Sequence, residues 1–139
     1  MKRFASLLFI GVCSLFLSGF ASGTEAETKG NIPYHATGKA RVYIYRTAAA
    51  SATVQPTVRL DGVNVGTVQP KVALYLDTTP EDHVVTVSKE AAGTLKLKVE
   101  NGGTRYVRLN VVDTRIVPEL VDNAIGEKEI ADCKLVAPQ

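Results

Sequence analysis

The chain has 139 residues, with 16 lysines and arginines against 14 aspartates and glutamates, two cysteines and no tryptophan. Two of the basic residues, Lys2 and Arg3, lie in a segment that we expect to be removed, which leaves 14 charges of each sign. This balance argues against nucleic-acid binding, which depends on clustered excess positive charge.

The N-terminus has the pattern of a secretory signal peptide. Lys2 and Arg3 precede an uncharged, apolar run from Phe4 to Phe20, and the small residues Gly19 and Ala21 suit the last positions before a cleavage site. A run of this length is near the lower limit for spanning a bilayer, so a retained anchor is the alternative. We predict a signal peptide over residues 1–21, a periplasmic or secreted mature protein, and no stable membrane insertion after cleavage.

The two cysteines argue against lipidation and against an internal disulfide. Cys13 lies in the middle of the apolar run and follows Val12, where a lipoprotein signal needs a small residue, so we predict that the chain is not a lipoprotein. After cleavage only Cys133 remains. It follows Ile130 by three residues in a predicted helical turn, which favours a buried thiol, with an intermolecular disulfide as the alternative.

A polar leader over residues 22–39 precedes a domain that alternates apolar and polar residues with the period of a β-strand. We predict strands at 41–46, 54–60, 63–68, 72–77, 85–87, 95–100 and 104–112. Asp61-Gly62 predicts a tight hairpin, because both central residues of such a turn need a positive φ. Pro56 lacks a backbone donor, so its strand begins after it or lies at a sheet edge.

The C-terminal segment departs from this pattern. Asp122 or Asn123 could cap a short helix that continues through Glu129 and is weakened by Gly126, and 134–136 could form a last short strand. The connections between the strands are too short for crossover helices. We therefore predict one mainly β domain over 40–137, an antiparallel immunoglobulin-like β-sandwich of about seven strands with one short C-terminal helix.

The sequence carries no recognisable catalytic motif. His35, His83 and Cys133 are far apart in the chain and do not have the spacing of a metal site, and we expect both histidines to be solvated. Ser51 and Ser88 lack the surroundings of a nucleophile, and no glycine-rich phosphate loop is present. The prediction is a protein without enzymatic activity, catalytic residues, metal or cofactor.

One group of side chains is a candidate binding face. The strand at 41–46 places Arg41, Tyr43 and Tyr45 on one side, and the strand at 104–112 places Tyr106 and Arg108 on one side. If the two strands share a sheet, these residues form an aromatic and basic face of the composition found at binding hot spots. The alternative is ordinary cross-strand packing, with tyrosine present for its β propensity.

The order of these motifs resembles the DUF2846 family of bacterial envelope proteins. The resemblance rests on residues 38–46, the Asp61-Gly62 turn with its flanking strands (58–66), residues 104–109 and a closing segment from Glu129 to Val136. The middle portion is also similar to PEGA-type domains. The resemblance implies a β-sandwich at the envelope of a Gram-negative bacterium and implies no activity. The chain departs from the family pattern in lacking a lipobox and in carrying Pro80-Glu81-Asp82-His83 where such domains often have Pro-Gly before the histidine.

These observations favour an exported, non-enzymatic β-sandwich that binds an unidentified envelope protein or glycan. One alternative is a small exported inhibitor of an envelope hydrolase that acts through loops such as 47–53. A second is a hydrolase whose catalytic residues are dispersed along the chain.

Overall fold

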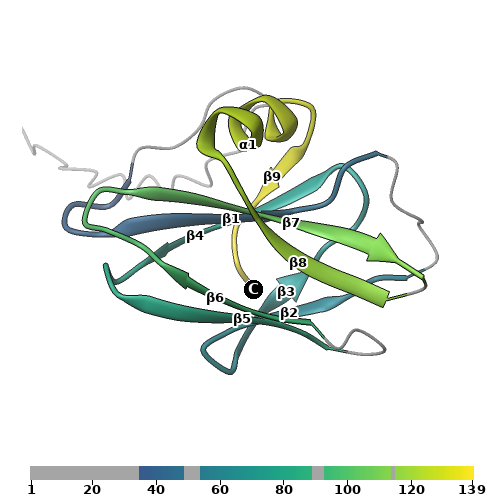
Figure 1. The fold of residues 1–139 in the computed structure, drawn as a ribbon. Helices are drawn as coiled ribbons and strands as arrows, with labels where there is room; N and C mark the ends of the chain where they lie inside the picture. Colours follow the sequence, from purple (N-terminus) through teal and green to yellow (C-terminus); the bar gives the residue numbers. More distant parts are fainter. Residues whose placement is uncertain (1–34, 49–53, 89–92, 114) are drawn as a thin grey trace, which may run out of the picture.

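Two β-sheets packed face to face form the domain, with a short helix on the outer side of one of them (Figure 1). The computed structural model describes residues 35–48, 54–88, 93–113 and 115–139, so the predicted signal peptide and nearly all of the leader lie outside it. The five-stranded sheet has the order β8 (Arg115–Val121), β7 (Thr104–Val112), β1 (Ala40–Tyr45), β4 (Val72–Thr78), β9 (Lys134–Val136). The four-stranded sheet has the order β3 (Val63–Thr67), β2 (Thr57–Leu60), β5 (Asp82–Ser88), β6 (Gly93–Lys98).

The predicted β-sandwich is confirmed, with two differences in its strands. The described residues contain nine strands rather than about seven, because β9 forms and because the sequence analysis assigned no strand to β8. β8 contains Pro118 and two successive exposed residues, Glu119 and Leu120, which break the alternation by which strands are identified. The sheets are also not wholly antiparallel, since β1 pairs with β7 and β4 with β9 in parallel.

Alternation along the strands builds the core between the sheets. β6 is an example, because Leu97 and the following Val99 are buried while Lys96 and Lys98 are exposed. The buried residues of this core are Ala40, Val42, Ile44, Val58, Leu60, Val65, Val68, Leu74, Leu76, Val85, Val87, Leu97, Val99, Val107, Leu109 and Ile116. The apolar pattern of the sequence therefore places the strands as predicted.

The local turn predictions are also confirmed. Asp61 and Gly62 have φ angles of 51° and 82° and connect β2 to β3, as the hairpin requires. β2 begins at Thr57, directly after Pro56.

Contacts join the two sheets at each lateral side of the sandwich. On one side, a Cβ built on Gly93 of β6 would lie 2.4 Å from Cδ of Pro118 and 3.0 Å from the carbonyl oxygen of Ile116, so only glycine lets β6 approach β8 so closely. On the other side, the backbone N–H of Gln139 donates to the carbonyl of Val65 in β3 at 3.3 Å.

The helix α1 (Asn123–Ile130) lies on the outer face of the five-stranded sheet (Figure 1). Asp122 is its N-cap residue but makes no side-chain capping bond, while Gly126 and Ile130 are buried against the sheet. Cys133 is buried, as predicted, and its thiol donates to the carbonyls of Glu129 and Arg46 at 3.6 and 3.7 Å. In the part of the chain that the structure describes, no helix is long and apolar enough to cross a membrane.

Candidate functional site

The structure brings the residues of the predicted binding face together. β1 and β7 are neighbours, and their parallel register pairs Tyr43 with Tyr106 and Tyr45 with Arg108. The rings of Tyr43 and Tyr106 stack, with centroids 5.1 Å apart and planes 6° from parallel. The juxtaposition that the alternation predicted is therefore present.

The same face is covered, which corrects its interpretation as an open binding surface. Arg41, Tyr43, Tyr45 and Tyr106 are 2%, 1%, 0% and 3% exposed. The three tyrosines are buried because α1 and the segment that follows it pack over them. With the tyrosines lie the buried residues Ala73, Val121, Ile130 and Cys133. These side chains form a second core, which is the packing alternative, and of the five predicted residues only Arg108 keeps partial exposure, at 25%.

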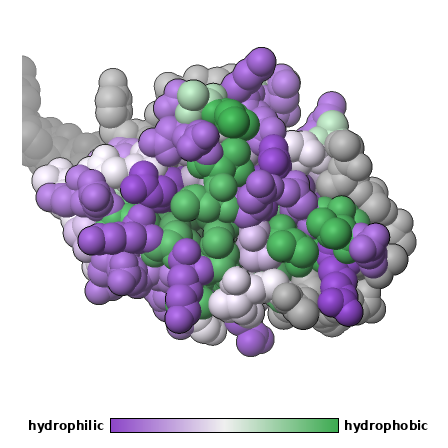
Figure 2. All heavy atoms as spheres, viewed as in Figure 1, coloured by the Kyte–Doolittle hydropathy of each residue, from purple (hydrophilic) through white to green (hydrophobic). Residues whose placement is uncertain are grey.

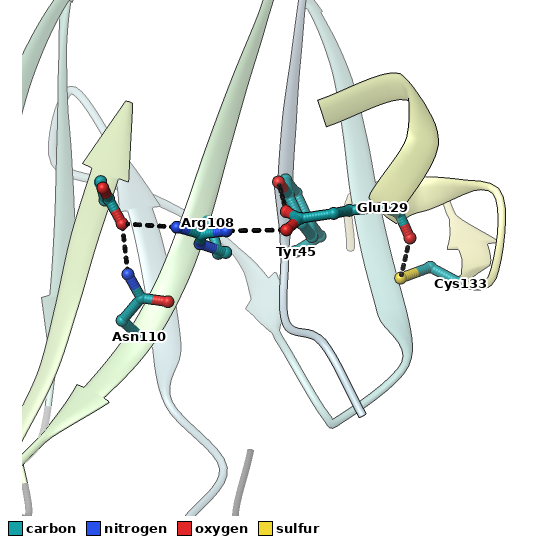
Figure 3. Close-up of polar contacts among 6 residues, drawn as sticks. Tyr45, Arg108, Asn110, Glu129 and Cys133 are labelled. Carbon is teal, nitrogen blue, oxygen red and sulfur yellow. Dashed lines mark hydrogen bonds and ion pairs between the residues drawn. The ribbon is translucent and has the colours of Figure 1, made fainter. Parts of the chain in front are cut away.

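A single carboxylate fastens the helix to this face (Figure 3). Oε1 of Glu129 accepts a hydrogen bond from Nη1 of Arg108 at 2.7 Å, and its Oε2 accepts one from the hydroxyl of Tyr45. The guanidinium of Arg108 also binds a second carboxylate: its Nη2 donates to Oε2 of Glu119 at 3.0 Å. Nδ2 of Asn110 donates to the same oxygen of Glu119. Glu129 was interpreted from the sequence as a charge on the helix surface, although its spacing of three residues from Gly126 places both on one helix face.

The surroundings of Tyr45, Tyr106 and Arg108 favour their protonated forms. Burial, and then the bond to Glu129, raise the pKa of Tyr45 far above its usual value. Burial, and then the charges of Glu127 and Tyr43, raise the pKa of Tyr106 to about 12. Hydrogen bonding to Glu119 raises the pKa of Arg108 above a value that is already high. Tyr45 and Arg108 therefore act as hydrogen-bond donors to Glu129 near neutral pH, and these bonds attach the helix to the sheet.

Arg41 plays a similar structural part at the start of the domain. Its Nε and Nη2 donate to the two carboxylate oxygens of Asp77 at 2.6 and 2.9 Å, and its guanidinium lies 5.1 Å from the ring centroid of Tyr75. The bond to Arg41 holds the pKa of Asp77 below its usual value. Oδ2 of Asp77 also accepts the backbone N–H of Ala36 at 3.2 Å, which ties the end of the leader to β4.

A second polar cluster surrounds His83, for which the sequence predicted exposure to solvent. His83 is only 2% exposed. Its Nδ1 lies 2.5 Å from Oδ2 of Asp61, and its Nε2 lies 2.8 Å from the carbonyl oxygen of Thr79 and 3.1 Å from Oγ1 of Thr78. The expectation was wrong because His83 shares the inward-facing parity of Val85 and Val87, so extending that strand by two residues buries the imidazole.

Asp61, His83 and Thr78 are arranged in the order of a hydrolase relay, but the hydrogen bonds of His83 favour a doubly protonated ring over a general base. The Thr79 carbonyl can only accept, so Nε2 carries a hydrogen, and the ionised Asp61 carboxylate likewise requires a hydrogen on Nδ1. An imidazole with both nitrogens donating has no lone pair to take a proton from Thr78. Burial by itself lowers the pKa of His83, but the bonds to the Thr79 carbonyl and to Asp61 outweigh it and raise that pKa.

A shallow hollow of about 420 Å³ lies beside this cluster on β5 and β6. It is lined by Asp82, His83, Val84, Lys96, Leu97 and Lys98. Its charged side chains are those of Lys96, Lys98 and Asp82. Among the described residues, no three histidines, cysteines or carboxylates gather as a metal site would require.

Exposed aliphatic side chains gather on a different part of the surface. Figure 2 shows apolar residues in a band that descends from the helix, with a further group toward one end of the molecule. Five of the six large apolar residues that are exposed in the described part of the chain belong to β7, β8 and α1: Val111, Val112, Val117, Leu120 and Ile125. We call these five residues the apolar band. The β7–β8 register places Val112 and Val117 on the face of the ribbon that carries Asn110, and it places Val111 and Leu120 on the opposite face, so the band extends over both faces of this edge ribbon. The sixth, Val63, lies on β3 in the other sheet.

Comparison with known proteins places the fold in a family. A family model described as a protein of unknown function, DUF2846, matches residues 36–121. No match to a curated protein was found. The matched residues run from the start of β1 to the end of β8, and the helix that covers the tyrosines lies after them. The match covers more than half of the chain, and this protein therefore belongs to the DUF2846 family.

Proposed function

We propose that this protein is an exported, non-enzymatic binding module of the bacterial cell envelope. The N-terminal pattern of basic, apolar and small residues supports export. The hydrogen bonds of His83, which occupy both ring nitrogens, support a role without general-base catalysis. The tyrosines that would have supplied a binding face belong to a core, so the module binds through another surface.

The apolar band carries this proposal, and it favours a protein partner over a glycan. Four of its residues lie on the β7–β8 ribbon and one lies on α1. Each of the five residues is 38–52% exposed to solvent. Aliphatic side chains gain free energy by leaving water and offer no directed hydrogen bonds, whereas sugar hydroxyls need such bonds. The four strand residues lie on both faces of the β7–β8 ribbon, at the edge of the sheet, and exposed apolar surface of this kind is typical of protein–protein contacts.

In-cell crosslinking from the apolar band tests the proposal. A photoreactive amino acid at position 117 of the full chain is expected to capture one abundant envelope protein, identified by mass spectrometry. Capture should be lost when Leu120 and Ile125 are replaced by lysine, and it should survive Val63→Lys, which puts the same charge at an exposed apolar position of the other sheet. Equal capture by both variants would exclude the apolar band.

Export is tested on the same cells. The mature protein should be found in the periplasm or the medium with Ser22 as its first residue, by mass spectrometry of the intact chain. Recovery of a membrane-bound chain that still contains Met1 to Ala21 would show a retained anchor instead.

The hydrolase alternative retains one observation, the order of Asp61, His83 and Thr78. If that cluster were catalytic, Thr78→Ala would abolish an ester or amide hydrolysis that the unmodified protein performs. We expect no such activity in either protein. The inhibitor alternative rests on the loop 47–53, of which only Thr47 and Ala48 lie in the described part of the chain.

A further inference from the structure

His83 joins three segments at one end of the four-stranded sheet. Asp61, in the β2–β3 turn, is bound twice to β5: its N–H donates to the carbonyl of Val84 and its Oδ1 accepts the N–H of Val84, both at 2.8 Å. Its second carboxylate oxygen binds Nδ1 of His83. The other ring nitrogen binds the carbonyl of Thr79 in the β4–β5 turn.

The groups that face the ring favour its positive charge. The carboxylate of Asp61 lies on the β2–β3 turn and that of Glu81 on the β4–β5 turn, and both stabilise a cation at His83. The hydroxyl of Thr78 is neutral and can accept or donate.

The cations near this end point elsewhere. The cross-strand neighbour of His83 on β6 is the apolar Leu97. Lys96 and Lys98 flank it and are exposed on the opposite face of the strand, and Arg105 of β7 donates to the carbonyl of Lys98 at 3.1 Å. Asp82, also exposed, is the register partner of Lys98 on that outer face. No described cation therefore makes a hydrogen bond or an ion pair with the ring.

We propose that His83 is a pH-responsive latch, whose proton holds the Asp61-Gly62 hairpin and the Thr79 turn against β5 and whose loss at higher pH loosens that end of the sheet. A neutral imidazole has one N–H, but His83 faces two groups that only accept. After deprotonation, one ring nitrogen has only a lone pair, and this lone pair faces a lone pair of either the Asp61 carboxylate or the Thr79 carbonyl oxygen. The two groups repel each other, so either the hairpin or the turn must move. The hollow beside β5 and β6 includes His83 in its wall, and its shape is coupled to the latch.

The direction of the pH dependence follows from linkage. Because folding raises the pKa of His83, its contribution to stability is complete below the unfolded value of about 6.5 and is lost as the pH rises through the folded value. The equilibrium between the latched and loosened states changes by up to about tenfold for each unit by which the folded value exceeds the unfolded one.

Nuclear magnetic resonance of the imidazole rings tests the first half of the proposal. The chain has two histidines, so His35→Gln leaves His83 as the only ring signal. We expect both nitrogens of that ring to be protonated at neutral pH and the midpoint of its titration to lie above about 6.5. Asp61→Asn should lower this midpoint while keeping the turn, because asparagine tolerates the φ of 51° at this position. A midpoint at or below the ordinary value, or one unchanged by Asp61→Asn, would overturn the latch.

Amide hydrogen exchange tests the second half. As the pH rises through the ring midpoint, the protection factors of the Asp61 and Val84 amides should fall relative to that of Ile44, an amide of the other sheet. The fall should persist in His35→Gln and be absent from His83→Gln. If His83→Gln does not fold, Asp61→Asn serves instead and should move the fall to lower pH. Protection that stays constant through the midpoint in the unmodified protein would show that His83 titrates without loosening anything.

Discussion

At the scale of single residues, the clearest case is Gly126. By helix propensity alone, glycine is a weakness in α1, because alanine would stabilise the helix by about 1 kcal/mol. In the structure a Cβ at this position would lie 2.1 Å from Cγ of Tyr106. The ring of Tyr43 stacks against that of Tyr106 and limits its movement away from the helix. The close approach of the helix to the sheet therefore requires glycine here.

Gly126→Ala is accordingly expected to destabilise the protein. Overpacking against a ring that cannot move away costs about 1–3 kcal/mol, which exceeds the gain in helix propensity. Urea denaturation followed by circular dichroism measures the change in unfolding free energy. Glu127→Ala, on the exposed side of the same helix, is the control and should change it by less than about 0.5 kcal/mol. Stabilisation by Gly126→Ala would show that Tyr106 can give way.

A second prediction at this scale concerns the carboxylate of Glu129. Glu129→Gln keeps the shape of the side chain but removes the charge from its bonds to Arg108 and Tyr45, and hydrogen bonds to charged groups contribute about 1.5–3 kcal/mol. Because 24% of the Glu129 side chain is exposed to solvent, we expect the unfolding free energy to fall by about 1–2 kcal/mol in the same urea experiment.

Glu119→Gln is the matched control, because Glu119 binds the same guanidinium but has 50% of its side chain exposed. Its loss should be at most about 1 kcal/mol, as for other surface ion pairs. Equal losses for the two variants would mean that the attachment of the helix does not depend on Glu129.

At the scale of elements, α1 and the turn at Cys133 that follows it decide the properties of the tyrosines beneath them. Since folding raises the pKa values of Tyr45 and Tyr106, their protonated forms stabilise the folded state fully below the unfolded value of about 10, and this stabilisation is lost as the pH rises above it.

Alkaline titration checks this expectation. Phenolate formation by Tyr45 and Tyr106, followed by ultraviolet absorbance, should accompany unfolding followed by circular dichroism rather than precede it. Tyr45→Phe and Tyr106→Phe identify the contribution of each residue to the absorbance change. Phenolate formation by Tyr45 or Tyr106 in the fully folded protein would indicate that α1 opens without the sheet.

At the scale of the whole molecule, β1 belongs to two cores. All six of its residues are buried, with Val42 and Ile44 facing the second sheet and Tyr43 and Tyr45 facing α1. The domain is therefore three layers deep at β1, and damage to this strand affects both cores. Such sharing of one strand favours a cooperative structure without an independently stable helical layer.

We therefore expect a single unfolding transition. Three of the five tyrosines, Tyr43, Tyr45 and Tyr106, lie in the outer core and Tyr75 packs against it, so tyrosine fluorescence mainly reports the helical layer, while circular dichroism reports both sheets. The two signals should coincide in urea, as two-state behaviour requires. An earlier change in fluorescence would show that α1 detaches first and exposes the tyrosine face, which would restore that face as a candidate binding surface.

The sequence by itself determined what depends on neighbouring residues. Period-two alternation located seven of the nine strands and separated Lys96 and Lys98 from the buried Leu97, because successive strand residues point to opposite faces. Asp61-Gly62 determined the hairpin through its positive φ angles, and the order of the motifs indicated the family that the comparison then confirmed. Alternation also put the five candidate residues on one face.

Only the tertiary structure decided which faces are covered. Alternation predicts that Tyr43 and Tyr106 share a face of the sheet. It does not indicate whether water, a partner or another part of the chain lies against that face. The bond from Tyr45 to Glu129 spans 84 positions and that from His83 to Asp61 spans 22, so no local period records either contact. The position of α1 follows from the packing of Gly126 on Tyr106, and that packing turned a predicted binding face into a second core.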